Sequence, residues 1–78
     1  MTTLTTALNT TFTPAAGTFN VQCTKGSVKL MRRQTSGADW GISGVLANGQ
    51  VGVVDNSVAA TDYKFVAVDG SPTVQADQ

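Results

Sequence analysis

The residues that most often carry enzyme chemistry are scarce in this sequence. There is no His and no Glu, so the single Cys, Cys23, lacks a His that could activate its thiol. Ser and Thr are numerous, but a hydroxyl nucleophile also needs a general base such as His. No glycine-rich loop ends in Gly-Lys-Ser or Gly-Lys-Thr, the ending that binds phosphate. The sequence therefore predicts a protein that is not an enzyme.

The acidic residues do not follow the pattern of a metal site. All five are Asp, and each lies at position 39 or later. Zinc would need Cys and His ligands. Calcium needs several oxygen ligands in one tight loop, and the closest approach, Asp55, Asn56 and Asp62, lacks the spacing of an EF-hand. Two Asp residues across a cleft could hydrolyse a glycosidic bond, but nothing in the sequence places such a pair. We expect no metal ion and no cofactor.

Four basic residues cluster in the first half of the chain, at Lys25, Lys29, Arg32 and Arg33. The formal net charge of the whole chain is nevertheless +0. Nucleic acid is not the expected partner, because phosphate binding needs a surplus of Lys and Arg. The simpler interpretation is that the cluster protects a strand edge. The alternative is a patch, including Lys29 and Arg33, that contacts another protein.

Two large aromatic side chains, Trp40 and Tyr63, each open a predicted strand after a polar loop. In a thin β domain both are expected in the core, where the indole N–H and the phenol O–H reach backbone partners. An exposed Trp40 would instead indicate recognition of carbohydrate or protein.

The composition favours β-strands. Twelve of the 78 residues are Thr, and strong helix formers are sparse. Apolar and polar residues alternate with a period of two in six segments, 19–23, 28–34, 40–46, 51–54, 63–68 and 73–76. Turns are expected at Lys25-Gly26, Asn48-Gly49 and 69–72, and Asn-Gly is a strong hairpin signal. The expected core consists of Phe19, Val21, Val28, Leu30, Trp40, Ile42, Val53, Phe65 and Val74.

The predicted fold is a small antiparallel β-sandwich of six to seven strands, or a partly open barrel, with an N-terminal arm. Residues 1–14 form the arm or an edge strand, and residues 15–78 form the sandwich domain. The apolar residues of the arm, Leu4, Leu8 and Phe12, are too few for a core of their own, but they could dock on a neighbouring subunit. A chain starting near Ala15 should then fold and lose its attachment. Because a chain of 78 residues buries little surface, docking or self-association would help to stabilise it.

The N-terminal segment does not follow the pattern of a signal peptide, because residues 1–13 contain no basic residue and no long apolar run. No stretch approaches the roughly 20 apolar residues that cross a bilayer. We therefore expect folding in a cytoplasm and no membrane partner.

Two segments resemble small virion proteins of tailed bacteriophages. The first is the run 28–32, followed by a loop containing Gly37 and then by Trp40. The second, 62–65, resembles the Tyr-containing penultimate strand of the same proteins, which are immunoglobulin-like or fibronectin-like β modules. The similarity covers residues 17–76. The single Cys departs from antibody-type domains, which carry a pair.

The resemblance implies a structural virion protein, placed on the capsid exterior as a decoration or cement protein that stabilises the head. Its partner would be the major capsid protein or another virion protein, with self-association as a further option, and it would be made in the host cytoplasm. The alternative function is a tail-associated module that binds a receptor or a carbohydrate, which would need exposed aromatic side chains. A small enzyme or an inhibitor is a third hypothesis, and the missing His argues against the enzyme.

Overall fold

The computed structural model describes residues 2–57 and 61–78, and the described residues form strands and no helix. The strands are β1 (Thr3–Thr5), β2 (Gly17–Arg33), β3 (Gly41–Leu46), β4 (Val51–Asn56) and β5 (Asp62–Asp77). The prediction of an all-β protein is confirmed. Within these two ranges there is accordingly no helix that could span a membrane.

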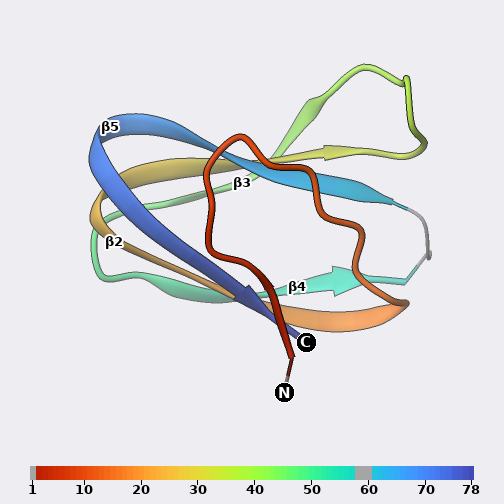
Figure 1. The fold of residues 1–78 in the computed structure, drawn as a ribbon, viewed down its shortest axis with the longest axis horizontal. Helices are drawn as coiled ribbons and strands as arrows, with labels where there is room; N and C mark the ends of the chain where they lie inside the picture. Colours follow the sequence, from red (N-terminus) through yellow and green to blue (C-terminus); the bar gives the residue numbers. More distant parts are fainter. Residues whose placement is uncertain (1, 58–60) are drawn as a thin grey trace.

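The five strands form one open antiparallel sheet with β2 at its centre. On one side of β2 lies β5, which pairs with it from Asn20 to Arg33, and β1 pairs with the C-terminal end of β5. On the other side, β4 pairs with residues 17–22 of β2 and β3 pairs with residues 28–32. Figure 1 shows that β2 and β5 both fold back on themselves, so that the two halves of the sheet enclose the core.

The bends occur where Gly26 of β2 and Gly70 of β5 lie opposite each other. Lys25, Gly26 and Gly70 have φ values of 64°, 150° and 69°. Positive φ at adjacent residues changes the direction of a strand, while the residues before and after the bend stay paired with the neighbouring strand. A Cβ atom on Gly26 would overlap the carbonyl oxygen of Asp69, so only glycine fits here.

These bends explain why the strand count differs from the prediction. The segments 19–23 and 28–34 are two halves of β2, and the segments 63–68 and 73–76 are two halves of β5. Lys25-Gly26 is a bend within a strand, where the sequence predicts a hairpin turn. The structure has five strands in a single bent sheet, and the predicted sandwich of six to seven strands is not confirmed.

The Asn48-Gly49 turn is present, but it does not join a hairpin. The Gln50 N–H donates to the Ala47 carbonyl at 3.1 Å, and Gly49 has a φ of 82°. The turn is anchored to β2, because the Gly49 N–H donates to the Cys23 carbonyl at 2.9 Å. As a result β3 and β4 follow β2 one after the other, and the sheet ladders pair each with β2 and not with each other. The turn thus connects β3 and β4, the two strands at this edge of the sheet, beside the bend in β2.

The core is built around four aromatic rings, of which Phe12 contacts the other three. Its ring centroid lies 5.8 Å from Phe19 and Phe65 and 5.9 Å from Tyr63. Edge-to-face and offset ring pairs of this kind add to the stabilisation from apolar burial. The buried hydrophobic residues are Phe12, Phe19, Val21, Cys23, Val28, Leu30, Tyr63, Phe65, Val74 and Ala76.

The structure confirms six of the nine predicted core residues: Phe19, Val21, Val28, Leu30, Phe65 and Val74. The prediction is wrong for Ile42 and Val53, which are 64% and 69% exposed, and for Trp40, which is only half-buried. Ile42 and Val53 lie on the outer surface of β3 and β4, which alternation alone cannot distinguish from the inner one.

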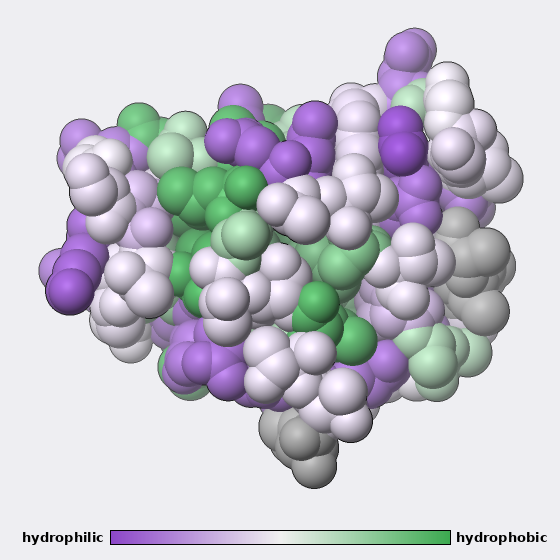
Figure 2. Space-filling model, in the orientation of Figure 1, coloured by the Kyte–Doolittle hydropathy of each residue, from purple (hydrophilic) through white to green (hydrophobic). Residues whose placement is uncertain are grey.

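The N-terminal segment closes one open side of the bent sheet. After β1, the Asn9 N–H donates to the Phe65 carbonyl at 2.8 Å, and Phe12 forms a bridge with Tyr63. The segment therefore runs along β5, and in Figure 1 it lies in front of β5 and β2, whereas β3 and β4 lie behind. Figure 2 shows that the surface on this side is largely hydrophilic or intermediate in hydropathy (purple and white), with scattered hydrophobic side chains (green).

Of the two alternatives predicted for residues 1–14, an arm or an edge strand, the structure agrees with the edge strand. The segment has an edge strand at Thr3–Thr5, and Phe12 is only 7% exposed. Leu4 and Leu8 are partly buried against the same core. Phe12 completes the aromatic cluster of the sheet, so the segment takes part in folding.

Candidate functional site

The most unusual surface of the molecule is the outer edge formed by β3 and β4, residues 41–46 and 51–56, which we call the β3–β4 edge. Each of these strands has a ladder to β2 on one side, and within the described chain no ladder on the other side. Four of its aliphatic side chains point to solvent: Ile42, Val45, Val51 and Val53 are 64%, 63%, 73% and 69% exposed. Its other two, Leu46 and Val54, pack against the core. Unpaired strand edges with apolar side chains favour pairing with another chain.

A cavity of about 180 Å³ lies between β3 and β4. Its lining runs from the exposed Val45 and Val53 to the buried Val21 and Leu30, so it connects the surface with the core. Gly44 leaves it open, because a Cβ atom at that position would meet nothing within 4 Å. The cavity therefore reaches Val21 and Leu30, which are themselves only 4% and 3% exposed.

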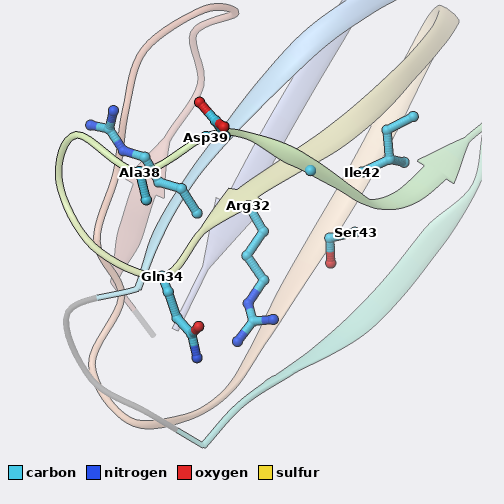
Figure 3. Close-up of a pocket in the computed structure, with 8 residues that line it drawn as sticks. Arg32, Gln34, Ala38, Asp39, Ile42 and Ser43 are labelled. Carbon is cyan, nitrogen blue, oxygen red and sulfur yellow. The ribbon is translucent and has the colours of Figure 1, made fainter.

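A second hollow, of about 570 Å³, lies beside the loop that follows β2. Its polar lining residues include Arg32, Gln34, Asp39 and Ser43. In Figure 3 Arg32 and Gln34 extend to one side of the chain and Asp39 points to the other, so these groups do not converge on one point. A binding site for a small polar ligand needs convergent groups, so this hollow is the weaker candidate.

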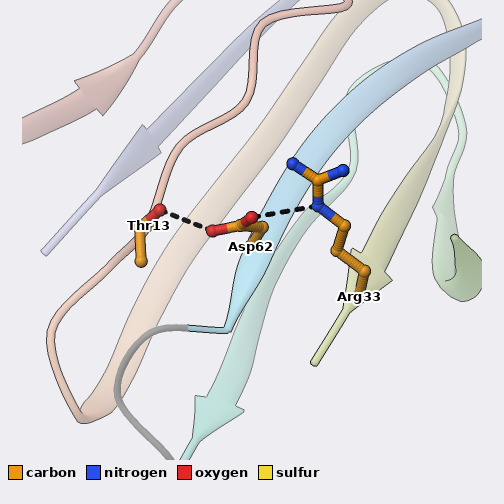
Figure 4. A network of polar contacts seen from close by, with 3 residues as sticks. All are labelled: Thr13, Arg33 and Asp62. Atoms are coloured by element: carbon orange, nitrogen blue, oxygen red, sulfur yellow. Dashed lines mark hydrogen bonds and ion pairs between the residues drawn. The ribbon is translucent and has the colours of Figure 1, made fainter. Parts of the chain in front are cut away.

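Arg33 forms a polar network that holds the ends of three segments together (Figure 4). Its Nε donates to Asp62 Oδ2 at 2.9 Å, and Thr13 Oγ1 donates to Asp62 Oδ1 at 2.7 Å. The Thr13 hydroxyl and the Arg33 guanidinium hold the pKa of the Asp62 carboxyl below its usual range. The network joins the N-terminal segment, β2 and β5, so it has a structural role.

Trp40 packs against cations on the outer surface. The Arg33 guanidinium carbon lies 4.4 Å from the ring centroid, and the Lys64 Nζ lies 4.5 Å from it. Cation–π contacts at partly exposed sites stabilise by about 0.5–2 kcal/mol. Trp40 thereby fixes the end of the loop before β3 against β2 and β5.

The predicted contact residues have different environments in the structure. Phe12 is buried and not accessible to a partner, and Leu4 and Leu8 pack against the core. Lys29 is half-buried on β2, between Val45 of β3 and Val66 of β5 in the sheet register. The basic cluster lies on the central strand, so it does not protect a sheet edge, and Arg33 is engaged by Asp62.

The groups that could do chemistry are dispersed. Cys23 is buried, its Sγ lies 3.3 Å from the Gly26 carbonyl oxygen, and burial raises the pKa of its thiol. A raised pKa keeps a thiol protonated and unreactive at neutral pH. Over residues 2–57 and 61–78, no three His, Cys, Asp or Glu side chains gather where they could hold a metal ion.

Sequence reasoning missed the β3–β4 edge, although its residues are recognisable. Val51 and Val53 alternate with Gly52, a pattern that also fits a buried strand. The absence of Lys and Pro from both strands leaves the edge without two common protective features, and this signal is visible in the sequence.

Comparison with known proteins gives no relative for this chain: no family model matches it, and no curated protein and no solved structure is significantly similar. Its function is therefore inferred from its own surface.

Proposed function

We propose that this protein is a structural module without catalytic activity that binds other protein surfaces, as an accessory protein on the capsid exterior of a tailed phage. The observation that supports the proposal is the β3–β4 edge, where four aliphatic side chains are more than half exposed beside unpaired strands. Unpaired strand edges with exposed apolar side chains favour pairing with another chain. The phage context comes from the sequence resemblance alone.

The alternative, a tail module that binds carbohydrate, receives less support. Such sites stack sugar rings on exposed aromatic faces, and the only Trp of the chain already contacts Arg33 and Lys64. Phe12, Phe19, Phe65 and Tyr63 are all buried. Little aromatic surface remains for a sugar.

The proposal is tested by mixing the purified protein with heads from a phage that lacks its gene and pelleting the heads. Decoration predicts that the protein pellets with the heads up to a fixed ratio to the major capsid protein, and that the decorated heads resist heat better. Tails from the same phage are pelleted in parallel. A protein that stays in the supernatant with both would contradict the proposal, and binding to tails alone would favour the alternative.

A further inference from the structure

The two open sides of the bent sheet differ in how they are covered. On one side, residues 2–12 pair along β5 and place Phe12 in the core. On the other side, β3 and β4 are the last strands of the sheet, and the cavity between them reaches Val21 and Leu30. A second chain could pair with this side of the sheet as the N-terminal segment pairs with the first.

We infer that the β3–β4 edge binds a second copy of this chain, forming a dimer whose two-fold axis runs parallel to the strands. In this arrangement β3 of one copy pairs with β4 of its partner, and β4 pairs with the partner's β3. The inference rests on the proposed function of the β3–β4 edge as a protein-binding surface, and it names the partner. Two-fold pairing of one patch with itself is the commonest form of self-association.

Strand direction permits this pairing. β3 and β4 both run antiparallel to β2, and the bend in β2 makes them run in opposite directions along the edge. Rotation about an axis parallel to the strands exchanges the two halves of the edge and leaves strand direction unchanged. The partner's β4 therefore lies antiparallel to β3, like the other pairs of this sheet.

Charge favours this arrangement over a dimer whose two-fold axis runs perpendicular to the strands. The half of the sheet that contains β3 carries Lys29, Arg32 and Lys64, in addition to Arg33, which is paired with Asp62. The half that contains β4 carries the carboxylates Asp55 and Asp77 and no basic residue. An axis perpendicular to the strands would pair β3 with β3 and bring the basic halves together. The parallel axis places each basic half beside an acidic one, and complementary charge favours the correct partner orientation. Three carboxylates also lie on or near the basic half: Asp62, Asp69 opposite Ser27, and the exposed Asp39 in the loop before β3. With Arg33 counted, its four basic residues still outnumber these three carboxylates, whereas the charged residues of the other half are carboxylates alone.

The apolar residues and the available area agree with this pairing. Ile42 and Val45 of one copy would lie across from Val51 and Val53 of the other, and such cross-strand aliphatic pairs stabilise sheets. The faces perpendicular to the shortest axis measure 30 × 28 Å between Cα atoms, and the β3–β4 edge lies on one of them. A face of this size can supply the roughly 800 Å² per partner that a stable interface buries.

Sedimentation velocity over a range of protein concentrations tests the inference. The wild type should sediment as a dimer at high concentration, and Val53→Lys should weaken the dimer by about tenfold or more, because it places an unpaired charge in the interface. Val68→Lys is the matched control, since Val68 is also exposed, at 58%, but lies on β5. It should leave the dimer unchanged. Melting curves of both variants verify that they fold.

Charge reversal tests the orientation. Lys29→Asp and Asp55→Lys should each weaken the dimer, and the double variant should restore it. A wild type that stays monomeric, or equal effects of Val53→Lys and Val68→Lys, would overturn the inference. If the monomeric wild type still pellets with heads and Val53→Lys does not, the edge binds a capsid protein and the proposed function stands. If the protein forms a dimer but pellets with neither heads nor tails, the dimer inference stands and the proposed function is contradicted.

Discussion

Gly26→Ala should destabilise the protein strongly, because the bend of the sheet depends on this residue. Gly26 has a φ of 150°, which side chains rarely tolerate, and strain of this kind costs about 1–3 kcal/mol. A Cβ atom would also overlap the Asp69 carbonyl oxygen of the facing strand, and Pro72 lies 3.3 Å away, so neither neighbour can move freely. Overpacking costs a further 1–3 kcal/mol. The free energy of unfolding should thus fall by about 2–6 kcal/mol, a large part of the total for a small domain.

Thermal unfolding followed by circular dichroism measures this effect. For a domain of this size each kcal/mol lowers the melting temperature by about 4–8 °C, so a fall of at least about 8 °C is expected. Gly44→Ala is the matched control, because Gly44 also lies in a strand and a Cβ atom there meets nothing within 4 Å. It should leave the melting temperature unchanged or raise it slightly. Similar melting temperatures for both variants would refute the role assigned to the Gly26 bend.

Three further predictions follow from the contacts of the N-terminal segment and the outer surface. Phe12→Ala should lower the free energy of unfolding in urea by about 3–5 kcal/mol, because the Phe12 ring contacts three core aromatics. Thr11→Ala, at the exposed neighbouring residue, should cost little. Equal losses would show that the segment does not complete the core. Trp40→Ala should cost only about 0.5–2 kcal/mol in the same assay, since the ring makes cation–π contacts on the surface, and a loss as large as that for Phe12 would place it in the core. Asp62→Asn should reduce the pH dependence of stability: the lowered pKa of Asp62 stabilises the wild type above about pH 4, and this contribution is lost as pH falls through the folded-state pKa. Identical curves of melting temperature against pH for the two proteins would contradict this assignment.

The sequence predicts the local features of this fold well. Alternation identifies the inner residues Phe19, Val21, Val28 and Leu30, because they lie on long regular stretches of β2 with one buried side. The positive φ at Gly26 could be expected from its residue type. Whether such a glycine reverses the chain or bends it depends on the strand that pairs opposite, which is a long-range contact. Local residue patterns do not encode that contact.

The candidate site illustrates the same limit. Val51 and Val53 alternate as a buried strand would, and only the order of strands in the sheet shows that they face solvent at an edge. Phe12 is the reverse case. It looks like part of a detached polar segment, but the core of the sheet needs its ring because one side is otherwise open.

Amide hydrogen exchange tests the central claim, that the β3–β4 edge is the binding surface, most directly. Exchange is measured at low and at high protein concentration, and again with purified phage heads. Binding at the edge predicts that amides of β3 and β4 that do not pair with β2 become protected in at least one of the two conditions, while residues 2–12 keep their exchange rates. Unchanged exchange in β3 and β4 under both conditions, or protection confined to the N-terminal segment, would contradict the claim.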